Sequence, residues 1–282
     1  MTLHDTAPVS AQEIEAWRAH IGRRELRRQR LDVETLRRFA AAQGADMDVE
    51  RQAPPLAHWA YFLETVGQEA IGSDGHPRRG GLLPAVRLPR RMFAAATMTF
   101  ETPLALDALA ELSITVTDVR HRSGKTGDLI FVEVDRRLSQ EGRERLTERQ
   151  TIVYRGAGQP TGPVVPIEPP PHSEASIWLP DSVELFRFSA ATFNSHRIHY
   201  DLPYANGEEG YPGLVVHGPL TAAKLFALAQ ARGGRAIQRF EFRAVTPLFV
   251  GQPIYLAPGG EDGEVQAIRC DGVVAMIAKA VF

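Results

Sequence analysis

Residues 193–220 hold the densest set of groups able to transfer protons or donate hydrogen bonds, in the runs FNSHRIHYD (193–201) and GLVVHGPL (213–220). The imidazole of His199 has an unperturbed pKa of about 6.5, so its neutral form is available as a base at neutral pH. The amide of Asn194 exchanges no proton there, but it can accept a hydrogen bond from water and donate one. This pairing is typical of general acid–base chemistry on a held water molecule. The alternative for a single histidine is a structural role in a loop.

The first half of the chain reads as helices followed by long strands. A capping box at residues 10–13 predicts a helix through Trp17, and a second helical repeat ends at Gly44. The aromatic run HWAYFL (58–63) predicts a buried segment that could also line an acyl tunnel, and residues 72–84, rich in Gly, Pro and charge, predict a mobile loop. Alternating or β-branched runs predict an antiparallel meander at residues 98–101, 112–117, 129–134 and 150–154, with a turn at 123–127.

The second half repeats this order. A short helix near Ser189 precedes the histidine-rich loop, and a helix from Pro219 to about Arg232 is apolar on most faces and should be buried. Strand patterns follow at residues 239–243, 254–256 and 272–282. Thr-Pro-Leu occurs at 102–104 and 246–248, after a strand in each half, which supports a duplication. We expect an α+β fold in which each half wraps a long antiparallel sheet around a central helix.

A proline-rich stretch separates the halves. Residues 156–174 contain six prolines and cannot sustain a helix or a sheet. We expect an N-terminal half at 1–155, which binds substrate without catalysing, a linker at 156–180, and a C-terminal half at 181–282 that carries the histidine-rich loop.

The composition excludes several classes of protein. A net charge of −2 gives no pull toward nucleic acid or an anionic membrane. Cys270 is the only cysteine, which excludes an internal disulfide and favours a reducing compartment. No apolar run is long enough to cross a bilayer, and the start MTLHDT lacks the layout of a secretory signal. We expect a cytoplasmic enzyme or binding protein. The basic run at residues 23–30 predicts a solvated helix face, which could also meet the phosphates of coenzyme A.

Two runs, TFNSHRIHYD (192–201) and EGYPGLVVHGP (209–219), and less specifically LPRRM (88–92), resemble the MaoC-like hydratase and dehydratase family in its double-hotdog form. The likeness is greatest to the branch of 3-methylfumaryl-CoA (mesaconyl-C4-CoA) hydratase, itaconyl-CoA hydratase and the type 2 hydroxyacyl-thioester dehydratases. The family's motif is commonly Asp, any residue, Asn, Pro, an aliphatic residue, then His. Here Asn194 stands at the Asp position, His199 at the His position, and His196 and Arg197 at the Asn and Pro positions. The usual catalytic carboxylate is therefore missing.

The resemblance implies a hydro-lyase that adds water reversibly to an α,β-unsaturated acyl-CoA, with His199 as base, Asn194 positioning water and Gly218 stabilising the thioester oxyanion. Pro219 suits the first helical position, which leaves Gly218 at the N-cap, where amides point outward and a thioester can approach closely. An ordinary helix entry is the alternative. The resemblance also implies contacts to the acyl-CoA from His196, Arg197, Tyr200, Val216, His217 and Pro219. Coenzyme A is part of the substrate, and no separate cofactor is expected.

The side chain of Arg197 marks a departure from the family's proline. A guanidinium can bind a carboxylate through two parallel hydrogen bonds, so Arg197 could select a dicarboxylic acyl group such as mesaconyl-C4 or itaconyl. A surface ion pair with Asp201 or Glu208 is the alternative. Asp201 should otherwise cap a turn, and His217 should brace the loop through a hydrogen bond.

Other functions remain open on the sequence. A hotdog acyl-CoA thioesterase also needs a polarised thioester and a held water, and an acyl-thioester binding protein needs no base. The offset between His196 and His199 could suit a metal, but no Cys or acidic partner stands at recognisable ligand spacing, so no metal is expected. We expect no nucleic-acid or membrane partner, and either a monomer or a homodimer.

Overall fold

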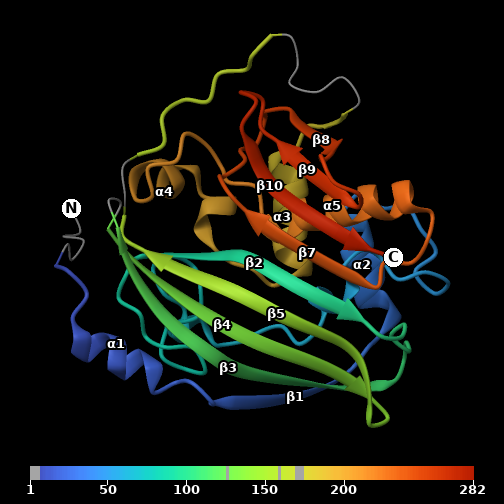
Figure 1. Ribbon diagram of the computed structural model, residues 1–282, viewed down its shortest axis with the longest axis horizontal. Coiled ribbons are helices and arrows are strands. Elements are labelled where there is room, and N and C mark those ends of the chain that lie inside the picture. The colour runs from blue at the N-terminus through green and yellow to red at the C-terminus, as the bar shows by residue number, and fades with distance from the viewer. Residues whose placement is uncertain (1–6, 125–126, 158–159, 169–174) are drawn as a thin grey trace.

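The computed structural model describes residues 7–124, 127–157, 160–168 and 175–282. In these ranges the strands form one antiparallel sheet in the order β1-β3-β4-β5-β2-β7-β10-β9-β8-β6 (Figure 1). The strands are β1 (Arg24–Arg30), β2 (Arg90–Phe100), β3 (Leu109–Gly124), β4 (Gly127–Gln140), β5 (Arg143–Arg155), β6 (Ser176–Trp178), β7 (Arg239–Ala244), β8 (Ile254–Pro258), β9 (Glu264–Ile268) and β10 (Val274–Val281). The helices are α1 (Ala11–Arg18), α2 (Val33–Ala42), α3 (Ser182–Ala191), α4 (Leu202–Gly207) and α5 (Gly218–Gly233), with 3-10 turns η1 (Ala57–Ala60), η2 (Gln68–Ala70) and η3 (Arg197–His199).

The two halves of the chain contribute matching parts to this sheet. Strands β1 to β5 lie on one side of the β2–β7 pairing and β6 to β10 on the other, in mirrored order. The pairing between the halves runs from Ala95 opposite Arg243 to Thr99 opposite Arg239. This is the duplicated, double-hotdog arrangement that the sequence predicts, with one sheet continuous across both halves.

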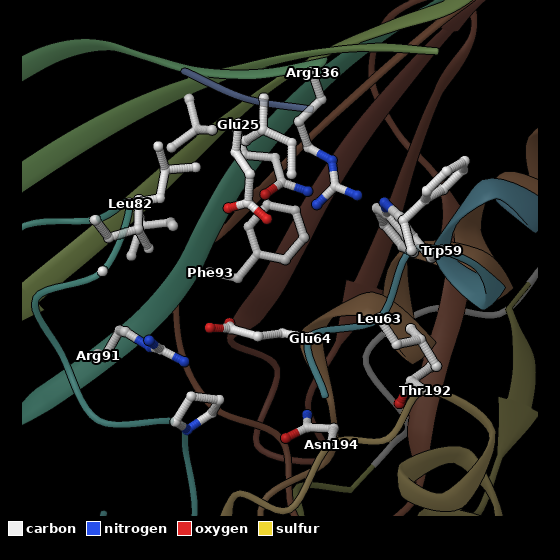
Figure 2. Close-up of a pocket in the computed structure, with 18 of the residues that line it drawn as sticks. Glu25, Trp59, Leu63, Glu64, Leu82, Arg91, Phe93, Arg136, Thr192 and Asn194 are labelled. Carbon is white, nitrogen blue, oxygen red and sulfur yellow. The ribbon is translucent and has the colours of Figure 1, made fainter. Parts of the chain in front are cut away.

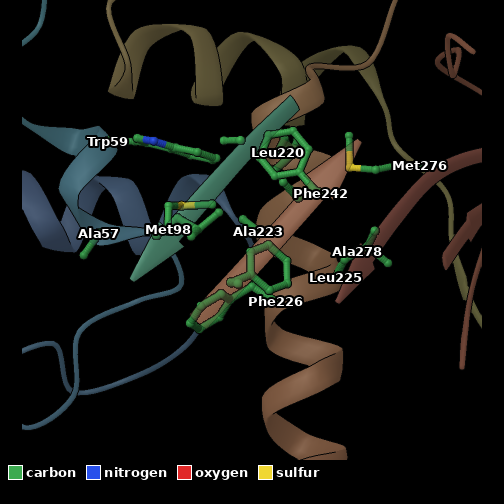
Figure 3. Packing of buried hydrophobic residues seen from close by; sticks show 14 of the residues in the cluster. Ala57, Trp59, Met98, Leu220, Ala223, Leu225, Phe226, Phe242, Met276 and Ala278 are labelled. Atoms are coloured by element: carbon green, nitrogen blue, oxygen red, sulfur yellow. The ribbon is translucent and has the colours of Figure 1, made fainter. Parts of the chain in front are cut away.

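Helix α5 is the central helix of the C-terminal half. It contacts β7, β8, β9 and β10 and buries Leu220, Ala223 and Leu225 almost completely. Met98 from β2 and Phe242 from β7 face the same helix (Figure 3). The helix ends at Gly233 and is capped by Gly234, whose φ of 64° is left-handed and favours glycine. The apolar composition of this helix therefore reflects burial on several sides.

An aromatic segment fills the corresponding space in the N-terminal half. The predicted burial of residues 58–62 is confirmed, and the Trp59 ring meets Phe93 edge-on at 5.8 Å and Phe242 at 6.1 Å between centroids. Helix α2, shorter than α5, packs on α3 through Phe39 and Phe188. Aromatic side chains from the N-terminal half thus reach the pairing between the halves.

Three strands depart from the sequence prediction. The basic run at 23–30 is not a helix face, because Arg24–Arg30 pairs with β3 as an edge strand whose residues alternate between exposed and half-buried. Strand β6 begins the second half inside the predicted 156–180 linker, and β9 was not predicted. None of the helices in the described ranges is long and apolar enough to cross a bilayer.

The prediction that the loop at 72–84 is mobile was wrong around residues 74 and 75, where the loop contacts the histidine-rich loop. The backbone N–H of Arg197 donates to the carbonyl of Asp74 at 2.9 Å. Gly75 has a φ of +88°, and a Cβ there would stand 1.9 Å from the carbonyl oxygen of Ser195. Only glycine permits this approach, so the loop of the first half is fixed against the histidine-rich loop of the second.

The packing at the β2–β7 pairing gives a stability prediction. Met98→Ala removes a side chain with 0% exposure and should lower the free energy of unfolding by about 2–5 kcal/mol, because the cavity cannot fully collapse. Arg239→Ala, on the neighbouring strand but exposed, should change it by no more than about 0.5 kcal/mol. Urea unfolding of the two variants measures the difference; equal effects would contradict the packing described.

Candidate active site

His199 is held in one tautomer by a backbone carbonyl. Its Nδ1–H donates to the oxygen of Val215 at 2.7 Å, because a carbonyl can only accept, and this leaves the lone pair on Nε2. The side chain is buried, and its pKa lies well below the usual value because of that burial and of the neighbouring His217 and His196. At neutral pH His199 is therefore an uncharged imidazole with a free basic nitrogen.

His217 stacks on His199 and braces it. The ring centroids are 3.6 Å apart with an angle of 20° between the planes. The Nε2 of His217 lies 2.9 Å from the hydroxyl oxygen of Ser189 on α3. Burial, with a smaller effect of His196, lowers the pKa of His217 to about 3, so it is a neutral wall behind the base. The hydrogen bond that the sequence predicts for His217 is present.

Asn194 and His196 are tied together by the turn of the loop. The backbone N–H of His196 donates to Oδ1 of Asn194 at 3.0 Å, which leaves the Asn194 amino group to face outward from the turn. The His196 ring meets His199 edge-on at 5.5 Å and lies 4.1 Å from the ring of His76, from the docked loop. Its Nε2 is 3.3 Å from the carboxylate of Glu209. Both halves thus contribute imidazoles to one row.

Gly218 begins helix α5, one residue earlier than predicted, and His217 rather than Gly218 is the N-cap. The Gly218 N–H belongs to the first turn, whose amides have no acceptor inside the helix. A Cβ at Gly218 would meet only the carbonyl of Phe93, at 3.8 Å, so packing does not require glycine there. The space left by the missing side chain is available to a ligand that approaches the amide.

One cavity of about 470 Å³, the site cavity, brings these groups together. Of the residues predicted for the site, it is lined by Asn194, His196, His199, Val216, Gly218 and Pro219. It shares Asn194, Pro219 and Phe93 with a second cavity of about 330 Å³, the adjoining cavity, which extends over the N-terminal strands (Figure 2). A single ligand can therefore touch His199 and Gly218 and still continue into the first half.

Three predicted residues lie outside the site cavity lining. The guanidinium of Arg197 makes two hydrogen bonds to one carboxylate oxygen of Asp201, at 2.9 and 2.7 Å, and stacks over the Tyr204 ring. This is the ion pair weighed as the alternative, and it faces a separate pocket of about 780 Å³. Tyr200 is half exposed and donates to the carbonyl of Ser195, and His217 lies behind His199. Asp201 caps α4, as predicted.

None of the charged side chains of the cavity was assigned to the site from the sequence, although Arg91 belongs to the run LPRRM (88–92). Arg91, Arg136 and Arg155 line the site cavity together with Glu64. Arg136 and Arg155 lie on strands whose alternation places them beside buried apolar residues, and that alternation was the available signal. Among the residues that the structure describes, no group of three or more His, Cys, Asp or Glu side chains is arranged to hold a metal ion.

Comparisons with known proteins agree with this layout. A family model described as hydroxyacyl-thioester dehydratase type 2 matches residues 56–250. The chain is 45% identical to the mesaconyl-C(4)-CoA hydratase of Chloroflexus aurantiacus over 80% of this chain and 82% of that one. It is 32% identical to the mitochondrial hydroxyacyl-thioester dehydratase type 2 of Schizosaccharomyces pombe over 44% of this chain and 38% of that one.

Solved structures support the fold. The crystal structure of HtdX from Mycobacterium tuberculosis superposes with a TM-score of 0.68 at 19% identity, covering 92% of this chain and 99% of that one. Another Mycobacterium tuberculosis protein, described as having a double hotdog fold, gives a TM-score of 0.55 at 13% identity and covers 93% and 96% of the two chains.

The buried imidazoles predict an acid-sensitive fold. The pKa values of His76 and His217 are about 3, below the roughly 6.5 of an unfolded histidine, so below pH 6.5 the unfolded chain binds more protons. The free energy of unfolding should therefore fall from pH 6.5 to 5, by at most about 1.4 kcal/mol per pH unit for each histidine, and show no such slope above pH 7.

Urea unfolding of the wild type and of His217→Gln between pH 5 and 8 measures this slope. The variant should lose stability less steeply with acid. Carboxylates such as Glu148, whose pKa is about 2, begin to add their own losses near the acid end of this window, but they do so in both proteins, so the difference between the two slopes reports His217. Identical slopes in the two proteins would show that His217 titrates alike in its folded and unfolded states.

Proposed function

This chain belongs to the hydroxyacyl-thioester dehydratase type 2 family, and we propose that it hydrates the double bond of a branched, dicarboxylic α,β-unsaturated acyl-CoA such as mesaconyl-C4-CoA or itaconyl-CoA, and catalyses the reverse dehydration. Family membership makes the protein a hydro-lyase. The identity of the acyl group is the proposal, supported by the 45% identity to a mesaconyl-C(4)-CoA hydratase. Coenzyme A enters only as part of the substrate.

The observation that carries this function is the shared cavity of His199 and Gly218. Hydration needs a base for the water that attacks Cβ, a proton donor for Cα, and donors for the negative charge on the thioester oxygen. The free Nε2 of His199 supplies the base, and Gly218, whose amide belongs to the first turn of α5, lines the same cavity. The helix dipole adds positive potential at that amide.

The low pKa of His199 shapes the proton transfer. His199 takes one proton from water as its oxygen bonds to Cβ, and the resulting imidazolium is disfavoured by burial and by the neighbouring imidazoles. The proton therefore passes on to Cα rather than staying on the ring. The hydroxyl ends on Cβ and one hydrogen on Cα, and His199 returns to its neutral form.

Asn194 takes the place of the family's carboxylate without its charge. Its Oδ1 already accepts the backbone N–H of His196, so its amino group is the part left for the cavity. An amino group donates to a water oxygen and turns one lone pair toward Cβ. We assign Asn194 a positioning role, and the proton transfers to His199.

An assay with three thioesters tests the reaction. The wild type is incubated with crotonyl-CoA, mesaconyl-C4-CoA and itaconyl-CoA while enoyl absorbance and free thiol are followed together. We expect loss of enoyl absorbance without release of thiol. Thiol release would instead identify a thioesterase, and binding without either change would identify an acyl-thioester binding protein.

Replacing the base tests its role. His199→Gln should lower kcat/KM by about 10²- to 10⁴-fold, the range for loss of general acid–base catalysis. His121→Gln, on β3 beside Asp128 and away from the site cavity, is the matched control and should stay within about threefold of wild type. Because the base form of His199 persists below pH 6.5, wild-type kcat/KM should stay level from pH 8 down to 6.5. A fall centred on pH 6.5 or above would contradict this assignment.

A further inference from the structure

Positively charged side chains outnumber negatively charged ones in the lining of the site cavity. Besides its histidines, the described lining holds Arg91, Arg136 and Arg155 against the single carboxylate of Glu64. A cavity built only for an apolar enoyl chain has no need of three guanidinium groups, because burying them costs free energy unless they are paired. The excess positive charge points to an anionic group on the ligand, in addition to the thioester.

Arg136 is oriented toward this space and is anchored from behind. It lies on β4, its side chain is 19% exposed, and it lines both the site cavity and the adjoining cavity. Figure 2 shows its guanidinium pointing into the cavity beside Trp59, with Asn194 at the opposite side of the view. Its Nε lies 3.4 Å from Oε2 of Glu148. No residue that the structure describes accepts a hydrogen bond from its two terminal nitrogens.

Glu148 is a fixed counter-charge, although no step of the proposed reaction uses it. Its side chain has 0% exposure, and its Oε1 accepts from Nε1 of Trp59 and from Nε2 of Gln150, each at 2.9 Å. Nε2 of His58 lies 3.4 Å from the other oxygen. Burial alone would raise the pKa of Glu148, but the contacts with His58 and Arg136 outweigh it and lower the pKa to about 2. The carboxylate is thus charged, and it forms an ion pair with the Nε side of the Arg136 guanidinium, without a hydrogen bond between them.

We propose that Arg136, held by Glu148, binds the free carboxylate of the acyl group and selects dicarboxylic over monocarboxylic enoyl thioesters. This inference rests on the proposed hydratase function and names the residue that sets its substrate class. The two terminal nitrogens present parallel N–H groups, the geometry that binds both oxygens of a carboxylate. An acyl group whose thioester oxygen lies at Gly218 extends into the region shared by the two cavities, which Arg136 lines.

The surroundings make this contact discriminating. Trp59, Phe93 and Ile152 line the adjoining cavity together with Arg136, and apolar walls of this kind lower the local dielectric constant and strengthen an ion pair. A monocarboxylic acyl group would leave the two terminal nitrogens of the same guanidinium without an acceptor on the ligand. The other two arginines differ, since among the described ion pairs neither Arg91 nor Arg155 has a buried carboxylate such as Glu148 to hold its guanidinium. We therefore assign to Arg136 the carboxylate binding that the sequence led us to expect of Arg197, which lines a different pocket.

The test compares two substrates that differ in the carboxylate. For Arg136→Gln we expect kcat/KM on mesaconyl-C4-CoA to fall by at least about 100-fold, while kcat/KM on crotonyl-CoA changes by less than about fivefold. Arg136→Lys keeps the charge but loses the paired N–H groups, and it should recover part of the loss. Arg137→Gln is the matched control, because Arg137 is the next residue on β4, is 65% exposed and pairs with Glu144; both substrates should be turned over as in wild type.

A second variant distinguishes a loss of substrate recognition from a loss of folding stability. Arg136→Gln leaves Glu148 buried with one partner fewer, so its Tm is measured alongside. The double variant Arg136→Gln/Glu148→Gln removes both charges, restores a neutral pair, and should show the same loss confined to the dicarboxylic substrate.

Two outcomes would overturn the assignment to Arg136. One is an equal loss on both substrates in the folded single or double variant. The other is a dicarboxylate-specific loss produced by Arg91→Gln or Arg155→Gln and not by Arg136→Gln. Either would leave the hydratase reaction intact, since turnover of crotonyl-CoA by the wild type establishes that reaction independently. Absence of turnover of every enoyl thioester by the wild type would instead overturn the proposed function, and this inference with it.

Discussion

The hydrogen bond from Nδ1–H of His199 to the carbonyl of Val215 is the contact on which the proposed chemistry depends. It fixes the tautomer, turns Nε2 toward the cavity, and joins two loops that are separate in the chain. Val215 completes the connection by donating its own N–H to the carbonyl of Ile198 at 2.9 Å. Because Gly218 follows Val215 by only three residues, the same contact sets the base and the first amide of α5 in a fixed relation. The carbonyl that fixes the tautomer of His199 belongs to the backbone, so this contact does not depend on the side chain at position 194. The tautomer is therefore fixed even though Asn194 replaces the carboxylate that is common in the family.

The two halves of the duplicated fold have diverged in what they contribute. The C-terminal half supplies the proposed proton-transfer groups and the helix start, on a loop braced by α3 and α5. The N-terminal half supplies the walls, with an aromatic segment, three arginines and a buried carboxylate on its long strands. The β2–β7 pairing and the docked loop around Gly75 hold one against the other. In the proposed mechanism the chemistry and the selectivity are carried by different copies of the repeat, so each could change without the other.

The sequence predicts most of this architecture where local patterns and burial agree. The long strands β3 and β4 alternate along their length, and α5 is apolar because it is enclosed, so both could be read directly. Strand β1 could not, because consecutive arginines resemble a solvated helix until the partner strand is known. The histidine-rich loop was found through its motif, whereas Arg136 was not, since the strand alternation hints at its burial but does not reveal its partner Glu148. The ion pair of Arg197 with Asp201 was weighed from their spacing, but only the fold shows that Arg197 faces a different pocket.

The composition of β1 affects how copies of this protein can meet. An edge strand presents unpaired N–H and C=O groups, to which a strand of another molecule can add. Here that edge carries Arg24, Arg27, Arg28 and Arg30 within seven residues, and the nearby Glu25 and Glu111 offset only part of the charge. Antiparallel alignment of two such edges would place guanidinium groups opposite one another, and their repulsion opposes extension of the sheet from one molecule to the next. The arginines that make β1 look like a helix face in the sequence thus also oppose the edge-to-edge association of folded molecules.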